Sequence, residues 1–117
     1  MRAEREHFEF FVATVDGEVV GTAVYFFAYF TWVGKSLYLD DLYVKPEFRG
    51  KKVASALLAR VFETAKNNDC QRVRWQVLDW NSGAIALYKK LGAAIDTEWF
   101  NCDFSATQIA QVAKQLS

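Results

Sequence analysis

Apolar residues form three separate runs in the first half of the chain. The runs at 8–15 and 19–30 are separated by Asp16-Gly17, a dipeptide typical of a two-residue hairpin turn. A third run covers 36–44 and should end at Pro46, because proline cannot donate to a sheet ladder. This half therefore predicts a three-stranded antiparallel meander.

Helical spacing dominates the second half, where Asn81 and Ser105 are typical N-caps and Gly92 is a typical stop signal. Apolar residues recur every three or four positions over 53–67, which indicates a helix with one apolar side. The expected elements, in order, are a helix over 53–67, a strand over 71–78, a helix over 82–90, a strand region over 95–104 and a terminal helix from Ser105 to about Leu116.

This order of elements predicts an α/β (α+β) fold. Its sheet should be mixed and mostly antiparallel, with the third and fourth strands parallel and joined by a crossover helix. No repeat, linker or low-complexity segment is present, so residues 1–117 are predicted to form a single domain. Such a sheet places a natural ligand site at the carboxyl end of the strand that leads into the crossover helix.

Composition narrows the class of protein. The 117 residues are 52% hydrophobic, enough for one core, and Lys+Arg equals Asp+Glu at 14 each. That balance argues against nucleic acid or a membrane surface as partner. The longest apolar stretch, 19–33, is too short and interrupted to span a membrane, and the start of the chain is charged where a signal peptide is apolar. A cytoplasmic protein is expected.

The sequence contains few residues that could bind a metal ion. The two cysteines, Cys70 and Cys102, fit no metal-ligand spacing, and His7 is the single histidine. We therefore expect no metal site. Both cysteines are expected to be free thiols that are buried or half-buried.

The loop after the third strand is the first candidate site. Arg49, Gly50, Lys51 and Lys52 immediately precede the predicted helix, whose N-terminus offers unpaired N–H groups and a favourable dipole for an anion. Gly50 would let a ligand oxygen approach the backbone closely. On its own, the pattern favours a plain polar turn that carries solvated lysines.

The same loop resembles the acetyl-coenzyme A signature of the GNAT superfamily of N-acetyltransferases, which reads Arg or Gln, two residues, Gly, one residue, then Gly or Ala. Arg49 and Ala54 match, Gly50 fits the frequent Arg-Gly start, and Lys52 stands where the central glycine usually is. A non-glycine residue at positive φ costs about 1 kcal/mol. Either the loop keeps φ negative at Lys52, or strain weakens binding and the lysine charge offsets part of it.

Further motifs resemble the spermidine/spermine and diamine acetyltransferase branch. They are the Trp-x-Gly-Lys turn at 32–35, the acidic strand at 38–41 and the Asn-to-Tyr helix at 81–88, within a similarity that runs over 10–104. The resemblance implies a GNAT (acyl-CoA N-acyltransferase) fold, acetyl-CoA as cofactor and acetyl transfer to a small-molecule amine by direct attack. It also implies a homodimer.

Members of this superfamily usually begin with a strand and one or two helices that cover the acceptor site, so the fold is expected to be shortened at its N-terminus. Either the sequence is truncated, or a second subunit supplies the missing wall.

The resemblance also assigns roles to residues. Tyr88 would be the general acid for the coenzyme A thiolate, although the residues alone allow a core tyrosine. Asp40, which matches a glutamate of the relatives, would take the amine proton through water. The implied cofactor contacts are Leu42, Tyr43, Val44, Arg49, Gly50, Lys51, Lys52, Val53, Ala54, Ser55 and Asn81, and the implied substrate contacts are Asp40, Trp32, Arg74, Trp75, Gln76 and Glu98.

Strand alternation separates Asp40 from the neighbouring Asp41. The two side chains should point to opposite faces unless a bulge intervenes. We expect a partly buried Asp40 in the cofactor cleft and an Asp41 that bonds backbone donors.

The acceptor and the activity stay open at this point. Phe30 occupies a position that is often acidic in polyamine-acetylating relatives, so an amino acid, a small amine, a diamine and a polyamine are all candidates. One alternative is a catalytically impaired domain that binds coenzyme A or a partner protein without turnover. Another is a plain aromatic-rich interaction module.

Overall fold

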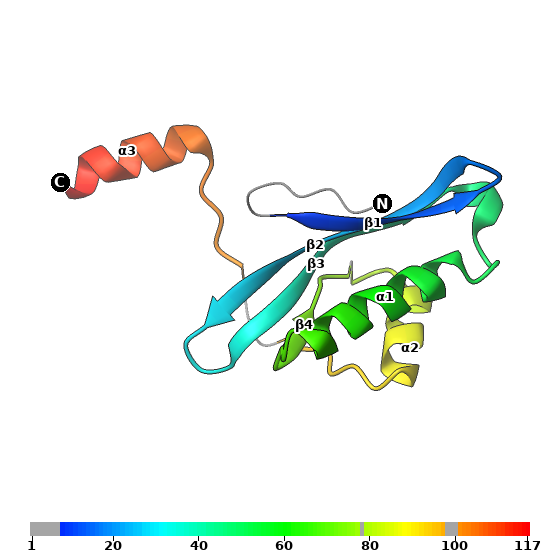
Figure 1. Cartoon of the computed structure of the whole chain (residues 1–117). Coiled ribbons are helices and arrows are strands. Elements are labelled where there is room, and N and C mark those ends of the chain that lie inside the picture. Colours follow the sequence, from blue (N-terminus) through cyan, green and yellow to red (C-terminus); the bar gives the residue numbers. More distant parts are fainter. Residues whose placement is uncertain (1–7, 78, 98–100) are drawn as a thin grey trace. The chain divides into compact units, whose positions relative to one another are not determined.

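A computed structural model of the chain shows a twisted sheet with a long helix against one face (Figure 1). It describes residues 8–77, 79–97 and 101–117. The chain divides into two compact units, 1–76 and 77–117, and each unit is described here by itself. Whether the chain acts as a single domain stays a prediction.

The predicted hairpin and meander are confirmed. β1 (Glu9–Val15) and β2 (Glu18–Phe30) are antiparallel, and both turn residues have positive φ, 50° at Asp16 and 80° at Gly17, as a type I′ turn requires. β3 (Gly34–Val44) pairs with β2 from end to end except at Asp40, and begins before the expected Ser36.

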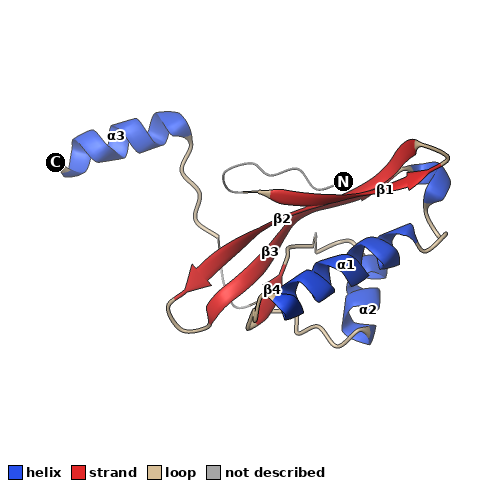
Figure 2. Ribbon diagram, viewed as in Figure 1, coloured by secondary structure: helices blue, strands red, loops and turns tan. Residues whose placement is uncertain are grey.

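The mixed sheet is also confirmed (Figure 2). β4 (Arg72–Arg74) lies parallel to β3, in the order β1-β2-β3-β4, and α1 (Val53–Asn67) makes the crossover. β4 is shorter than the predicted strand over 71–78, of which Leu78 lies outside the described residues. After Arg74 the chain leaves the ladder, and the Trp75 ring packs edge-on against Phe62 at 6.0 Å between ring centroids.

The core of the first unit lies between α1 and the sheet. Leu57, Leu58, Val61 and Ala65 form the buried stripe that the helical spacing predicts. The buried sheet residues are Ala23, Tyr25, Leu37, Leu39 and Val44. Burial of a large apolar side chain stabilises a fold by about 1.5–3 kcal/mol, so this layer fixes α1 and the loop that precedes it.

Gly21 allows α1 to approach β2 closely. A Cβ at this position would lie 3.1 Å from Leu57 Cδ1, 3.1 Å from Val53 Cγ1 and 3.2 Å from the Tyr43 carbonyl oxygen. These distances are shorter than ordinary van der Waals contact. The glycine therefore sets how near the first turns of α1 lie to the sheet.

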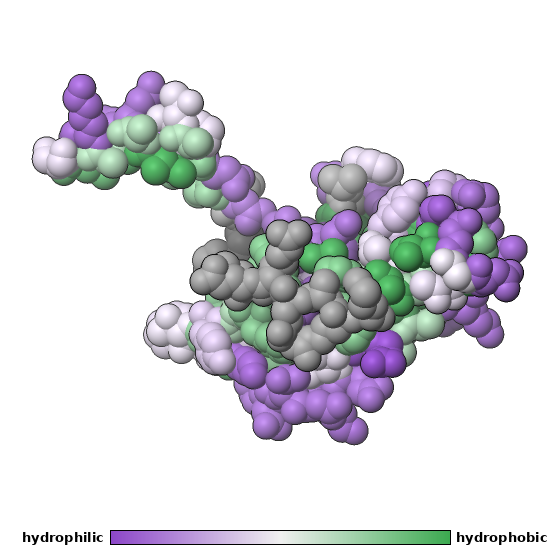
Figure 3. Space-filling model, turned by 45° about the horizontal axis from the view of Figure 1, so that its top comes forward, coloured by the Kyte–Doolittle hydropathy of each residue, from purple (hydrophilic) through white to green (hydrophobic). Residues whose placement is uncertain are grey.

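The second unit contains two helices with predicted caps. In α2 (Ser82–Lys90), Asn81 Oδ1 accepts a hydrogen bond from Ala84 N at 3.2 Å. α3 (Ala106–Leu116) begins with a capping box between Ser105 and Gln108. Figure 3 shows that apolar residues gather along one side of α3 and polar residues along the other.

The predicted strand over 95–104 is wrong for the residues that the structure describes. Residues 95–97 and 101–104 belong to no strand, and 98–100 lie outside the described residues. An apolar run becomes a strand only beside a partner, and the described residues of this unit contain no strand to pair with. None of the helices in the described part of the chain has the length and apolar run that a membrane crossing requires.

Candidate functional site

The C-terminal half of β3 has an open edge. β2 pairs with β3 as far as Val44, whereas β4 pairs only with Ser36, Leu37 and Tyr38. Over 39–44, no described strand lies on the β4 side. The predicted cofactor contacts Leu42, Tyr43 and Val44 lie on this stretch. Its backbone groups can therefore bond a ligand that carries amides, as in strand addition.

A β-bulge separates the two aspartates of β3. Tyr25 pairs with Leu39 and Val24 pairs with Asp41, which leaves Asp40 without a partner in β2. The sequence predicted that Asp40 and Asp41 point to opposite faces unless a bulge intervenes, and this bulge is present. Both aspartates are exposed, and neither carboxylate bonds another described residue. The expected partial burial of Asp40 and the backbone bonds of Asp41 are therefore wrong.

The loop after β3 is tied back to the end of that strand. A short 3-10 turn at Pro46–Phe48 begins with a bond from Phe48 N to Lys45 O at 2.9 Å. Arg49 Nε then donates to the Val44 carbonyl at 3.0 Å, and its guanidinium carbon lies 5.9 Å from the centre of the Tyr43 ring. This bond uses one N–H of Arg49. The remaining N–H groups of the guanidinium are available to an anion.

The loop and the first turn of α1 present a row of unpaired N–H groups. Within the described part of the chain, no backbone N–H from Gly50 to Ser55 donates a hydrogen bond, and Ala56 N makes the first helical bond, to Lys52 O at 3.0 Å. Gly50 has φ 78°, and a Cβ there would meet nothing within 4 Å. This space and these donors fit the phosphate oxygens of a ligand.

Lys52 adopts the left-handed conformation, with φ 64° and ψ 16°. The alternative of a negative φ at this position is therefore wrong, and the strain of about 1 kcal/mol is present. The Lys52 ammonium has no partner among the described residues, whereas Lys51 Nζ lies 5.6 Å from the centre of the Phe48 ring. Lys52 thus keeps its charge free at the start of α1.

The other cation near the site, Lys45, has a local partner, and both cysteines are free thiols. Lys45 Nζ donates to Glu18 Oε2 at 3.0 Å, and this bond raises the pKa of Lys45. Burial raises the pKa of the half-buried Cys70 thiol. Cys102 is also free but exposed, so its expected burial is wrong. In the residues described, no group of three or more His, Cys, Asp and Glu side chains is placed to hold a metal ion.

The predicted substrate residues are not all gathered at one place. Arg74 pairs with Tyr38, which lies two residues before Asp40 on β3, so the segment 74–76 begins near the bulge. In this segment, Arg74 and Gln76 are exposed and Trp75 is half-buried. Trp32, 96% exposed, lies in the turn before Gly34. Gly34 is six residues from Asp40 in the same strand, so the turn that carries Trp32 lies about 20 Å from Asp40. Glu98 lies outside the described residues.

Two predicted residues belong to the second unit. Asn81 caps α2 through its side-chain oxygen, and its amide nitrogen has no partner among the described residues. Tyr88 follows seven residues later on the same helix and is half-buried. That spacing corresponds to two helical turns, although Asn81 is the N-cap and lies just outside α2, so a shared ligand contact stays a prediction.

Sequence reasoning missed two features of the first unit. The bond from Arg49 to the Val44 carbonyl has no sequence signal, because a loop arginine alone does not specify its acceptor. A pocket beside α1 includes Arg60, Thr64 and Asn68. Their four-residue spacing, which places them in one row on a helix, was available as a signal.

Comparison with known proteins gives consistent similarities. Residues 1–93 match the model of the acetyltransferase (GNAT) family. Thialysine N-epsilon-acetyltransferases are 42% identical in Sus scrofa and 49% identical in Bos taurus, over 81% and 68% of this chain but 58% and 47% of their own lengths. The chain thus spans about half the length of these relatives. An integron cassette protein from V. cholerae has a similar structure, with TM-score 0.83 and 26% identity over 96% of this chain and 70% of that one.

Proposed function

The chain belongs to the GNAT acetyltransferase family, and from this premise we propose that it transfers the acetyl group of acetyl-CoA to a primary amine of a small molecule. The observation that carries the proposal is the row of unpaired N–H groups from Gly50 to Ser55, directly after the open edge of β3. A phosphate-binding row beside a free strand edge suits a ligand that carries both a pyrophosphate and amides.

The residues present fit acetyl-CoA. The N–H groups of Gly50 to Ser55, with Arg49, Lys51 and Lys52, would hold the pyrophosphate, and the backbone of 42–44 would bond the amides of the pantetheine arm. Val44 O already accepts from Arg49, so the other groups of this stretch would carry most of that pairing. Asn81 is proposed as a further contact through its amide N–H groups. When bound, acetyl-CoA supplies an acyl group activated as a thioester.

Two side chains are proposed to move protons during the transfer. Attack of the amine nitrogen on the bound thioester would require the amine to lose a proton and the departing sulfur to gain one. The Asp40 carboxylate accepts the proton of the amine through a bridging water, for which its exposed position leaves room. The Tyr88 hydroxyl donates a proton to the thiolate. Acetylated amine and free coenzyme A are the products.

The proposed acceptor is a lysine-like amino acid, a diamine or a polyamine. The two mammalian relatives are thialysine N-epsilon-acetyltransferases, which favours an amine at the end of an aliphatic chain. Trp75, Gln76 and Glu98 are the proposed substrate contacts in addition to Asp40. Trp32 is not proposed as one, because it lies about 20 Å from Asp40 along β3. Arg74 is exposed and would favour an acceptor that also carries a carboxylate.

The oligomeric state, the location and the partners of the whole protein are also proposed. We propose a homodimer located in the cytoplasm, with no nucleic-acid or membrane partner. The equal numbers of basic and acidic residues, 14 each, support the last point.

Calorimetric titration with acetyl-CoA and an acetylation assay on a panel of amines test the proposal together. Binding at micromolar concentration and steady thiol release with at least one diamine or amino acid are expected. Binding without turnover on any amine would favour the second candidate, a domain that binds coenzyme A without catalysis. The left-handed Lys52 favours that candidate, because the strained residue lies in the phosphate loop. Absence of binding would refute both.

A further inference from the structure

The C-terminal part of β2 has a free edge on the side of β1. β1 begins at Glu9, which pairs with Tyr25, whereas β2 continues to Phe30. Residues 26–30 therefore pair with β3 alone, and no described strand lies on their other side. Figure 2 shows β2 and β3 continuing together past the start of β1. This free edge is distinct from the open edge of β3 over 39–44, which faces the β4 side.

Backbone groups of two residues point out of this free edge. Lys35 O accepts from Gln71 N at 2.8 Å, so the backbone groups of Lys35 point toward the β4 side. Tyr29 pairs with Lys35 and therefore directs its own N–H and carbonyl away from β3, because these groups alternate along an antiparallel ladder. Phe27, two residues earlier in β2, does the same. Two donors and two acceptors are thus available to an added strand.

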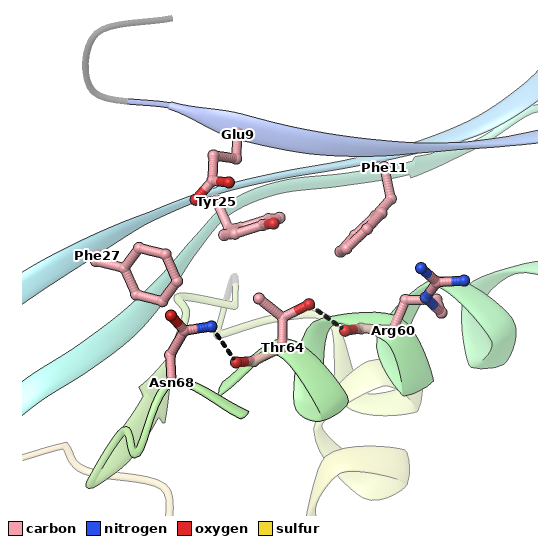
Figure 4. Close-up of a pocket in the computed structure, with 7 residues that line it drawn as sticks. All are labelled: Glu9, Phe11, Tyr25, Phe27, Arg60, Thr64 and Asn68. Atoms are coloured by element: carbon pink, nitrogen blue, oxygen red, sulfur yellow. Dashed lines mark hydrogen bonds between the residues drawn. The ribbon is translucent and has the colours of Figure 1, made fainter. Parts of the chain in front are cut away.

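The side chains of the free segment are aromatic in a symmetrical order. Residues 26–30 read Phe-Phe-Ala-Tyr-Phe, with Ala28 at the centre. Figure 4 shows the Phe27 ring at the pocket beside α1, and by strand alternation Tyr29 belongs to the same face of the sheet. Ala28 lies on the other face with Phe26 and Phe30. Each face therefore carries aromatic rings at equal spacing from Ala28.

Contacts within the chain hold the rings on the face opposite α1. Phe26 stacks on Tyr38, with centroids 5.2 Å apart, and the Arg72 guanidinium carbon lies 4.5 Å from the centre of the Phe30 ring. Phe26 and Phe30 are half-buried, and Tyr29 on the α1 face is largely exposed. An exposed apolar strand edge of this kind is a template for pairing with another chain.

We propose that residues 26–30 of two copies of this chain pair as antiparallel strands about a two-fold axis at Ala28. Phe27 exchanges two hydrogen bonds with the partner's Tyr29, and the symmetric pair exchanges two more. Aromatic rings meet across the strands on both faces, because Phe26 lies beside the partner's Phe30 on the face opposite α1. This contact rests on the homodimer proposed above and names the surface that forms it.

The register follows from the free length and from the order of the side chains. β1 occupies the edge of β2 up to Tyr25, so a partner strand has residues 26–30 available. An axis at Ala28 uses all five and sets every aromatic residue against another. An axis at Tyr29 would instead set Ala28 against the partner's Phe30, and Tyr29 alone would face an aromatic ring. The axis at Ala28 therefore gives the better match.

The area of the contact indicates a dimer that dissociates on dilution. Tyr29 can lose roughly 150 Å² of surface, because its side chain is large and the residue is 76% exposed. Together with the half-buried rings, the two strands bury roughly 700–800 Å² in total. Stable complexes bury about 1,200 Å² or more. The pairing thus suits a weak, reversible dimer.

Sedimentation velocity of the full chain over a concentration series tests whether this dimer forms. An equilibrium between monomer and dimer is expected, and a monomer at every concentration would overturn the proposal. Ala28→Lys places two ammonium groups opposite each other at the axis and should raise the concentration of half-dimerisation at least about fivefold. Ala28→Glu should do the same, and an equal mixture of the two variants should restore the dimer.

Val19→Lys is the matched control for the added charge. Val19 is an exposed apolar residue at the other end of β2, outside the free segment, so its replacement should leave the dimer unchanged. The rescue by mixing shows that both Ala28 variants are folded. A mixture that stays monomeric, or an equal loss with Val19→Lys, would contradict the axis at Ala28.

Disulfide trapping tests the register in a Cys102→Ser background, which removes the exposed native thiol. Residues opposed at the axis form a non-hydrogen-bonded pair with Cα atoms about 4.5 Å apart, which a disulfide can span. Ala28→Cys should therefore cross-link two copies under mild oxidation. Tyr29→Cys should not, because the two copies of residue 29 are too far apart, although this position is the more exposed one. Preferential cross-linking at position 29 would overturn the register.

Acetyl-CoA titration separates this inference from the proposed transferase activity. Tyr29 pairs with Lys35, which is nine residues from Val44, so the axis lies about 30 Å from the phosphate-loop end of β3. Ala28→Lys should therefore bind acetyl-CoA as the unaltered chain does. Weaker binding by this variant would contradict the separation of the two surfaces, whereas absence of binding by the unaltered chain would refute the transferase alone.

Discussion

Replacing Lys52 by glycine should stabilise the protein, because Lys52 has φ 64° and glycine adopts this conformation without a steric penalty. The left-handed conformation costs a residue with a Cβ roughly 1–2 kcal/mol. The unfolded chain is more flexible with glycine at this position, which reduces the gain by about 0.4–1 kcal/mol. The expected net gain in the free energy of unfolding is therefore about 0.5–1 kcal/mol, which corresponds to roughly 2–4 °C in Tm for a domain of this size.

Urea denaturation measures this gain as a shift of the midpoint at constant slope. Lys51→Gly is the matched control, because Lys51 is the neighbouring lysine and lacks a positive φ, so its replacement should destabilise the fold. Lys52→Ala removes the charge but keeps the Cβ, and should leave the stability nearly unchanged. If Lys52→Gly lowered the stability as much as Lys51→Gly does, strain at Lys52 would be refuted.

Three other predictions follow from particular contacts. Gly21→Ala should destabilise the fold by about 1–3 kcal/mol in the same assay, since its Cβ would press on Leu57, Val53 and the Tyr43 carbonyl; an unchanged midpoint would contradict the close approach of α1. Arg49→Ala should weaken calorimetric acetyl-CoA binding at least about tenfold, whereas Lys45→Met, which removes a lysine already bonded to Glu18, should have a much smaller effect. Alkylation of Cys70 by iodoacetamide at pH 8 should be slower than that of a free model thiol, because burial raises the pKa of Cys70 and keeps its thiolate scarce. The rate should increase as the pH rises. Equal rates for Cys70 and the model thiol would contradict the raised pKa.

Local signals in the sequence predicted most elements of the fold. Asp16-Gly17 identified the hairpin, and the apolar spacing over 53–67 gave the bounds of α1, because one turn type and one helix side are decided within a few residues. The caps at Asn81 and Ser105 were predictable for the same reason.

Features that depend on distant partners were not predictable. The bulge at Asp40 is defined by the register with Val24 and Tyr25, so the sequence of β3 alone could not place it. The short β4 and the lack of a strand among the described residues 95–97 and 101–104 have the same origin, because pairing rather than composition decides where a strand ends. In the candidate site, the motif indicated the phosphate loop, but only the backbone shows that Lys52 is left-handed and that Arg49 bonds Val44.

Acetylation of an amine panel, followed by mass detection of the products, distinguishes an acetyltransferase from a domain that only binds acetyl-CoA. We expect a product one acetyl group heavier with at least one diamine, polyamine or amino acid, formed with equimolar release of coenzyme A. Tyr88→Phe should slow this turnover while acetyl-CoA binding stays the same, because only the departing thiolate needs the hydroxyl proton. A protein that binds acetyl-CoA tightly but acetylates no amine of the panel would refute the proposed acetyl transfer.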